Sequence, residues 1–455
     1  MRPSVSLLVP VMLLTGCASL TRTPYVRPDA PLPTGFAHAA AGASSPVRDD
    51  RWWRGFGDPS LDALIDLAIA RNPDLAAAAV RVRRANLQAR LTGNALLPIA
   101  SGTLSTGLSR PLSGDRRGAE TATGTVGVNW EADLFGKLAA DRDAARFEAL
   151  ATAEDRDAAF LSLVGTAASL HWQVALANER IGLGEQSLAY ARRVATLVET
   201  QYRAGAVSAL ERREVEQVVT AQDAALSQLR QTRTEARQAL MVLLDGAAPP
   251  GRERQTLEGV RLPAIAAGLP ADLLGRRPDL RAAELRLRRT LASSDATRAS
   301  YYPALTLTGG LGTSSTALLN LVSNPVATLG AGLTLPFLNV RARRFDTAIA
   351  RANYDEAVIL FRKSLYTALA EVENALSART ELAAQGEALR TARDAAAAAE
   401  RLYEVRYRAG AVPLRSWLDA QERRRTADLA YSGNRFTLLQ NRVVLHQALG
   451  GGFAR

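Results

Sequence analysis

Long stretches of the chain carry the spacing of apolar residues that is typical of amphipathic helices. Proline is absent between Pro111 and Pro249, and the segment 138–202 is rich in Ala, Leu, Arg and Glu, which are strong helix formers. This composition predicts a single helix about 100 Å long, at roughly 1.5 Å per residue. A second helix is expected over 208–245, with an apolar stripe facing a partner. The chain turns between the two helices at Gly205, which can adopt the left-handed conformation that ends a helix.

The segment before each long helix has a different spacing of apolar residues. Every second residue is apolar from 125 to 134 and from 327 to 335, after shorter alternating runs near 100–109 and 304–312. A period of two predicts strands, so we expect two β-hairpins. Two half-buried hairpins on a soluble core fit the alternation alone equally well. Strands of about ten residues are also long enough to cross an outer membrane at a tilt.

The same motifs occur twice, 205 residues apart. The matched pairs are Arg71–Leu75 with Arg276–Leu280, Tyr202–Val207 with Tyr407–Val412, and Leu244–Gly246 with Leu449–Gly451. A register held over this length indicates a duplicated unit with few net insertions. The second copy repeats the helical signature as well, because proline is absent from Val340 to Val412.

The N-terminus has the form of a bacterial lipoprotein leader. Met1-Arg2 precedes an apolar run from Val5 to Leu14, which is too short to span a bilayer as a helix. The run ends in Leu14-Thr15-Gly16-Cys17, which has the form of a lipobox, and Cys17 is the one cysteine of the chain. We therefore expect a covalent lipid on Cys17. Ala18 follows it, and by resemblance to bacterial lipoproteins this residue directs the chain to the outer membrane, facing the periplasm.

Composition and charge narrow the class of protein. A hydrophobic content of 47% with a mean hydropathy of −0.05 indicates a folded protein and excludes a disordered one. The formal net charge of +11 comes almost entirely from arginine. Because these arginines are interspersed with acidic residues along helices, and aromatic content is only 5%, we expect no nucleic-acid partner.

Four strands impose a condition on assembly. They cannot close a barrel, and an open strand edge is not tolerated in lipid. If the strands cross a membrane, the chain must therefore assemble with copies of itself. Two copies would give eight strands, whose interior side chains fill the barrel, and three would give twelve, which leave room for a water-filled lumen.

The sequence contains no constellation typical of an enzyme or a metal site. The three histidines, His38, His171 and His446, are far apart and none belongs to an HExxH-like motif. The glycine-rich segment Gly309-Gly310-Leu311-Gly312 lies in a strand pattern, and no Lys-Ser or Lys-Thr follows it. We therefore expect a non-enzyme without cofactors other than the lipid.

Several motifs together resemble those of the TolC-type outer-membrane efflux lipoproteins, over nearly all of the mature sequence. They are RWWRGFGDP at 51–59, GLPADLLGRRPDL at 268–280, and YRAGAV at 407–412 followed by WLDAQER at 417–423. The resemblance implies a mainly α-helical, internally duplicated chain. Three copies would form a twelve-stranded membrane β-barrel that continues as a long α-helical periplasmic barrel.

The resemblance also implies a function. Such proteins are passive exit ducts of tripartite, RND-type efflux pumps in the outer membrane of Gram-negative bacteria, and they extend into the periplasm. The implied partners are a periplasmic membrane-fusion adaptor, an inner-membrane pump and outer-membrane lipid, and the implied cargo is a small toxic compound. The alternatives are a type I protein-secretion channel and a lipid-anchored coiled-coil scaffold that transports nothing, although a scaffold would not need the alternating strands.

The resemblance assigns two kinds of site. The hairpin tips would dock the adaptor, and the implied residues are Tyr202, Arg203, Gly205, Ala206, Val207, Tyr407, Arg408, Gly410, Ala411 and Val412. An aperture gate would follow the second tip, with Asp419 at a position whose carboxylates ring the pore. Arg415 stands where close relatives often carry leucine. Arg415 and Asp419 are spaced i and i+4 on one helix face, so we expect them to lie near enough to pair.

These patterns divide the chain into five parts. We expect a signal peptide over 1–16, a lipid-anchored segment over 17–60, repeat 1 over 61–246, a linker over 247–275 and repeat 2 over 276–451. Repeat 1 would hold a β-hairpin over 100–134 and a helical hairpin over 138–245, and repeat 2 would hold the same elements over 304–337 and 340–449.

Overall fold

The computed structural model describes residues 21–39, 51–110, 112–113, 118–315 and 325–451. The chain forms two compact units, and each unit is assembled from three separate segments. Unit 1 comprises Met1–Ala30, Val80–Asp155 and Leu280–Ser364, and unit 2 comprises Pro31–Ala79, Arg156–Asp279 and Leu365–Arg455.

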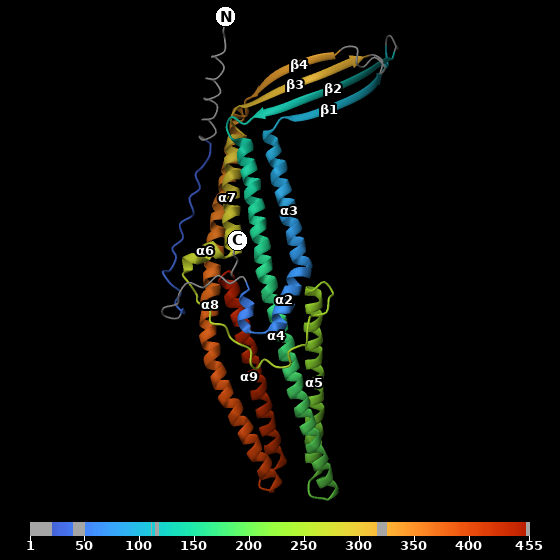
Figure 1. Ribbon diagram of the computed structural model, residues 1–455, viewed down its shortest axis with the longest axis vertical. Coiled ribbons are helices and arrows are strands. Elements are labelled where there is room, and N and C mark those ends of the chain that lie inside the picture. The colour runs from blue at the N-terminus through green and yellow to red at the C-terminus, as the bar shows by residue number, and fades with distance from the viewer. Residues whose placement is uncertain (1–20, 40–50, 111, 114–117, 316–324, 452–455) are drawn as a thin grey trace. The chain divides into compact units, whose positions relative to one another are not determined.

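Helices account for most of the described residues (Figure 1). They are α2 (Pro59–Arg71), α3 (Pro73–Gly93), α4 (Lys137–Arg203), α5 (Ala209–Leu243), α6 (Leu273–Arg276), α7 (Pro278–Ala299), α8 (Val340–Arg408) and α9 (Leu414–Ala448). The strands are β1 (Ile99–Ser109), β2 (Ala119–Ala132), β3 (Ala304–Ser315) and β4 (Pro325–Thr334). α4 and α8 are 67 and 69 residues long, and no proline interrupts either of them.

The four strands belong to unit 1 and form a single antiparallel sheet in the order β1-β2-β3-β4. β2 belongs to repeat 1 and β3 to repeat 2, so their pairing joins the two repeats. The register places Val126 opposite Gly102 on β1 and opposite Leu311 on β3, and Leu311 opposite Ala327 on β4. This register determines which side chains share a face, because residues directly opposite each other point to the same side.

The core of unit 2 is built around the tryptophan-rich segment that precedes α2. Trp52, Trp53 and Phe56 are buried and pack in one cluster with Trp172 of α4 and Leu240 of α5. An 18-residue window of α4 has a mean hydropathy of 1.3, high enough by composition for a membrane span, but 61% of that window is buried inside the protein. We interpret α4 as a core helix.

In both repeats, the same kind of hydrogen bond joins the beginning of the repeat to its end. The residue before each Pro-Asp-Leu motif donates a hydrogen bond to the last carbonyl of the helix that ends its repeat. In repeat 1, Asn72 Nδ2 lies 3.0 Å from the Leu243 carbonyl oxygen. In repeat 2, Arg277 Nη1 lies 3.1 Å from the carbonyl oxygen of Ala448. Each pair is again offset by 205 residues, so the duplicated motifs hold the end of each repeat against its beginning.

A buried carboxylate ties three segments of unit 2 together. Asp58 is the N-cap of α2, where its side chain accepts hydrogen bonds from the backbone of Ser60 and Leu61. Its Oδ2 also lies 3.2 Å from His171 Nε2 on α4 and 3.3 Å from Arg254 Nη1 in the linker. Burial alone would raise the pKa of Asp58, but the hydrogen bonds from His171 and Ser60 outweigh it and hold the pKa well below its usual range.

The described N-terminal segment is bound to α7 within unit 1. Thr23 donates from its backbone nitrogen and its hydroxyl to Asp295. Arg27 forms an ion pair of 2.7 Å with Glu284, and the hydroxyl of Tyr25 donates to the same carboxylate. Burial and the neighbouring Glu284 raise the pKa of Tyr25 to about 12, so this hydroxyl remains a donor at neutral pH.

Candidate functional site

The sheet of unit 1 has two chemically different faces. The apolar face follows from the register and carries large exposed hydrophobic side chains, which are Leu104, Leu108, Val126, Val128, Leu307, Leu311, Leu329 and Leu333. Leu329 is 94% exposed. Because large exposed apolar surfaces are costly in water, a face of this kind is covered in the assembled protein by lipid or by another chain.

The opposite side, which we call the hydroxyl face, carries mainly Thr, Ser, Asn and Gly. Its members include Thr103, Ser105, Thr121, Thr123, Thr125, Asn129, Thr306, Thr308 and Thr328. Ser105 and Thr123 lie opposite each other and share a hydrogen bond of 2.5 Å, and Thr328 donates to the Gly310 carbonyl. The large apolar exceptions, Ile99 and Val326, are the first residue of β1 and the second of β4. An apolar face opposite a polar one is the pattern of a strand between lipid and water.

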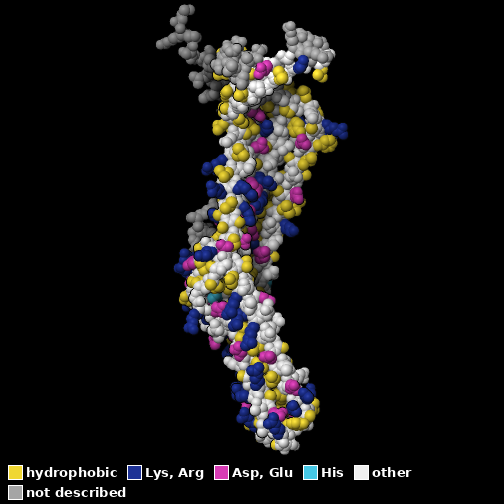
Figure 2. Space-filling model, turned by 90° about the vertical axis from the view of Figure 1, so that its right-hand side faces the viewer, with side chains coloured by type: hydrophobic (Ala, Val, Ile, Leu, Met, Phe, Trp, Pro, Cys, Tyr) yellow, Lys and Arg dark blue, Asp and Glu magenta, His cyan; other side chains and the backbone are white. Residues whose placement is uncertain are grey.

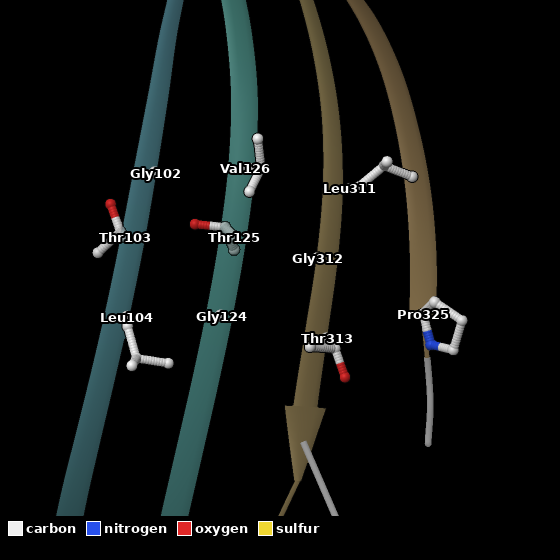
Figure 3. A pocket seen from close by; sticks show the side chains of 10 residues that line it. All are labelled: Gly102, Thr103, Leu104, Gly124, Thr125, Val126, Leu311, Gly312, Thr313 and Pro325. Carbon is white, nitrogen blue, oxygen red and sulfur yellow. The ribbon is translucent and has the colours of Figure 1, made fainter. Parts of the chain in front are cut away.

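A hollow of about 500 Å³ is lined by all four strands, near the end of the sheet where β3 finishes and β4 begins. Figure 3 shows its side chains, among them Leu104 on β1, Val126 on β2, Leu311 on β3 and Pro325 on β4. These four belong to the apolar face, and glycines lie between them. The hollow therefore offers an apolar surface rather than a site with converging polar groups.

Both edges of the sheet lack a strand partner among the described residues. β1 pairs only with β2, and β4 pairs only with β3. The outward N–H and C=O groups of β1 and β4 therefore need partners from outside this sheet.

The first hairpin tip lies between α4 and α5 in unit 2. Gly205 has a φ of +74°, and the backbone nitrogen of Ala206 bonds to the Gln201 carbonyl at 2.8 Å, which is the pattern of a Schellman C-cap. Ser208 and Glu211 then form a capping box that starts α5. Tyr202, Arg203, Gly205 and Ala206 are exposed, and Val207 is half-buried.

The second tip repeats this backbone geometry between α8 and α9. Gly410 has a φ of +73°, and Ala411 bonds to the Arg406 carbonyl at 2.9 Å. Arg408, Gly410 and Ala411 are exposed, whereas Tyr407 and Val412 are half-buried. All ten predicted tip residues therefore lie at helix-ending turns within unit 2.

The two tips differ in their side-chain environment. Tyr407 stacks on Trp417 with 5.1 Å between the ring centroids, and its hydroxyl donates to Gln201 Oε1 at 2.9 Å. Its counterpart Tyr202 is exposed and lies under the guanidinium of Arg212. The identical motifs therefore have different local roles, because one tyrosine packs between the two helical hairpins and the other faces outward.

Glu400, a buried carboxylate near the tips, belongs to none of the sequence motifs. This side chain of α8 is 4% exposed. Its Oε1 accepts hydrogen bonds from Tyr190 of α4 at 3.1 Å and from Trp417 of α9 at 3.3 Å, and Oε2 lies 3.1 Å from Arg424. Burial and Glu400 raise the pKa of Tyr190, so its hydroxyl stays a donor. A lone glutamate after the five alanines at 395–399 was the available signal in the sequence.

Arg415 pairs within one chain with a carboxylate other than the one on its own helix. Both side chains are exposed, and no ion pair in the described part of the chain joins them. Arg415 Nη1 instead lies 3.6 Å from Glu214 Oε1 of α5. An acidic residue four positions after a basic one is the less favourable order on a helix, and Glu214 offers an alternative carboxylate across the helix pair. The role of Arg415 and Asp419 at an aperture remains a prediction.

Charges and potential metal ligands do not gather at one place. Figure 2 shows Lys and Arg side chains interspersed with Asp and Glu side chains over the helices. Within the described ranges, no group of three or more His, Cys, Asp or Glu side chains is arranged to hold a metal ion. Cys17 lies outside the described residues, so its predicted lipidation has no structural counterpart here.

Comparison with known proteins gives the context of this geometry. The sequence model of the family described as outer membrane efflux protein matches residues 64–246 and 269–451. The two matches begin and end 205 residues apart, as the repeated motifs do. The duplication is therefore a property of the family fold.

Individual relatives cover nearly the whole chain. It is 32% identical to the pyoverdine export outer membrane protein OpmQ of Pseudomonas putida, with 98% of this chain and 97% of OpmQ covered. It is 29% identical to the antibiotic efflux pump outer membrane protein ArpC of Pseudomonas putida, over 99% and 95% of the two chains. The open state of the MtrE outer membrane channel of Neisseria gonorrhoeae superposes with a TM-score of 0.80 at 28% identity, covering 95% of this chain and 98% of MtrE.

These matches confirm the predicted fold class, a mainly α-helical and internally duplicated chain with the membrane β-sheet of the trimeric outer-membrane channels. They confirm the predicted role in efflux and the location in the outer membrane with extension into the periplasm. The relatives are transport proteins and outer-membrane components of efflux systems. The chain belongs to the outer membrane efflux protein family.

Proposed function

We propose that three copies of this chain form the exit duct of a tripartite efflux pump, with the hydroxyl face of each sheet lining the water-filled lumen. The observation that carries the proposal is the two-faced sheet with two open edges. In lipid these edges must be paired, and β1 of one copy can pair with β4 of the next. Three copies give twelve strands, enough for an aqueous channel.

The duct is passive and has no enzymatic activity. Its partners are a periplasmic membrane-fusion adaptor and an inner-membrane pump, which supplies the energy. We infer that the cargo consists of small toxic compounds rather than secreted polypeptides, and the description of ArpC as part of an antibiotic efflux pump supports this class. The two-faced sheet argues against a scaffold that transports nothing, because a scaffold would have no use for an exposed apolar face.

The neighbouring residues Leu329 and Thr328 test the duct. They lie on the apolar and hydroxyl faces of β4 respectively. Leu329→Arg places a charge in lipid, which costs about 2–4 kcal/mol near the bilayer midplane, so the yield of inserted trimer should fall sharply. Thr328→Arg should insert normally and shift the preference of the channel in planar bilayers toward anions.

Light scattering of the parent protein in mild detergent should give the mass of three chains. A stable monomer, or equal effects of the two substitutions on insertion, would contradict the duct.

We further propose that Cys17 carries a covalent lipid that anchors the N-terminus to the outer membrane. The lipobox supports this assignment, and the described segment beginning at Thr21 is bound to unit 1 soon after the cysteine through the contacts of Thr23 with Asp295. Cys17→Ser should abolish incorporation of radiolabelled palmitate, because serine offers no thiolate to accept the lipid. Equal labelling of parent and variant would refute the assignment.

The two tips are proposed to dock the adaptor. Ala206 and Ala411 are exposed at the turns, so Ala206→Trp combined with Ala411→Trp should obstruct a docked partner while the barrel stays intact. Efflux-dependent resistance should fall to that of a strain lacking the protein, with trimer levels unchanged.

The glycines of the tips provide the matched control. Among the described residues, no atom beyond the neighbours of each glycine would contact a Cβ at Gly205 or Gly410, so the positive φ is the main local constraint, and asparagine tolerates that conformation. Gly205→Asn with Gly410→Asn should therefore retain resistance. Full resistance in the tryptophan double variant would show that the tips are turns without a docking role.

Arg415 and Asp419 are proposed to line the aperture of the trimer, with Glu214 holding Arg415 within each copy. Asp419→Ala should remove three carboxylates from the constriction while each Arg415 keeps its Glu214 partner, and should shift ion preference toward anions. Glu214→Gln should have a smaller effect, since an exposed ion pair contributes only about 0.2–1 kcal/mol. Single-channel recording measures both variants, and parental conductance with parental ion preference in Asp419→Ala would exclude this residue from the aperture.

A further inference from the structure

Unit 2 contains a cavity of about 250 Å³ away from the tips. Three segments line it: the linker, α8 and α9. The linker contributes Leu257, Val260 and Leu262, and α9 contributes residues at the spacing of one helix face, including Tyr431, Asn434, Leu438 and Arg442.

The wall formed by the linker is held in place by several hydrogen bonds, two of them at Leu257. The backbone nitrogen of Leu257 donates to Glu179 Oε2 at 2.6 Å, and the Leu257 carbonyl accepts from Arg435 Nη2 at 2.7 Å. Leu257 itself is fully buried. The linker is therefore fixed opposite α9, and the space between them is part of the folded structure.

A buried hydrogen-bond acceptor without a donor lines this cavity. Asn434 is 4% exposed, and its Nδ2 donates to the Leu382 carbonyl at 3.1 Å and to Gln385 Oε1 at 2.9 Å. Both amide hydrogens are thus used, which fixes the orientation of the amide. Its Oδ1 has no hydrogen-bond partner among the described residues. Gly386 lies against this oxygen, since a Cβ there would lie 2.8 Å from it, so Asn434 is a fixed part of the cavity wall.

An uncompensated positive charge lines the same cavity. Arg442 makes no ion pair in the described part of the chain, and its Nε is buried without a hydrogen-bond partner. Burial and the nearby Arg379 both lower the pKa of the Arg442 guanidinium, so its surroundings disfavour the charge that it carries. The one acidic residue of the cavity lining, Glu387, is already paired with Arg390 at 2.8 Å.

We propose that this cavity binds a small organic acid, with the carboxylate on Arg442 and an apolar body against Leu257, Val260 and Leu438. A carboxylate is the natural partner of an unpaired guanidinium. The apolar walls exclude a bare inorganic anion as the preferred ligand, since such an ion would lose its hydration without compensation. The volume corresponds to about eight water-sized groups at roughly 30 Å³ each, the size of a single-ring acid rather than a lipid chain.

The probe that fits these requirements is 3-fluoro-4-hydroxyphenylacetate, followed by ¹⁹F NMR with the full chain in nonionic detergent. We expect saturable binding to the parent protein. Unlabelled 4-hydroxyphenylacetate should displace the probe. Tyramine, which carries an ammonium in place of the carboxylate, and inorganic phosphate should not compete.

Two arginines of α9 give a matched pair of variants. Arg442→Met should weaken binding by about tenfold or more through loss of the charged partner, and Arg442→Lys should recover part of it. Arg423→Met removes an exposed arginine of the same helix outside the cavity and should bind as the parent does.

The ligand series requires no substitution, so it tests the site even if Arg442→Met fails to fold. Absence of saturable binding to the parent, equal competition by tyramine, or unchanged affinity in a folded Arg442→Met would overturn the proposal. Ligand binding is measured independently of conductance. Absence of binding would therefore not contradict the proposed duct, and a negative result for the duct would not contradict the proposed binding site.

Discussion

The open edges of a four-stranded sheet are the constraint on which the rest of this structure depends. Each edge strand presents backbone N–H and C=O groups that neither water nor lipid can satisfy within a bilayer, and the apolar face of the sheet rules out water as its surroundings. Self-assembly is therefore required for the sheet to exist in a membrane. The hydroxyl face becomes the interior of whatever structure closes it.

Duplication supplies the strands and helices in matched pairs, and the closure contacts explain how each copy stays intact. Asn72 and Arg277 differ in chemistry, yet both donate to the last carbonyl of a helix. Arg277 makes further ion pairs with Asp279 and Glu371, which Asn72 cannot form. The two copies thus share the geometry of closure, but only the second adds charged contacts, a difference that the shared Pro-Asp-Leu motif conceals.

Local patterns predicted the elements well because they depend on local chemistry. The helix expected over 138–202 lies at Lys137–Arg203, and the turns at Gly205 and Gly410 have the positive φ that favours glycine. β2 begins at Ala119, six residues before the alternation in the sequence becomes clear. Its first residues are Ala, Glu and Thr, whose polarity does not distinguish the two faces, so the alternation did not mark the start of the strand. Such residues acquire strand structure by pairing with β1, the neighbouring strand of the same hairpin.

Contacts between segments that are far apart in the chain could not be predicted from the sequence patterns. His171 carried no motif, and its pairing with Asp58 depends on how α4 passes the N-cap of α2. Arg415 had an acidic residue four positions along its own helix, yet its carboxylate partner is Glu214 on α5. In both cases the choice of partner is set by helix packing, which spacing along one helix does not encode.

The linker is another segment whose contacts could not be predicted from the sequence, and these contacts shape the cavity. Its composition predicts only a connection between repeats, but in the fold it is anchored at both ends of a short stretch, by Arg237 to Glu253 and by Arg435 to Leu257. A segment fixed in this way costs conformational entropy, and a connector of flexible chain would avoid that cost. The ordering is accounted for if the stretch forms a wall, since a cavity keeps its shape only when every segment around it is held in place.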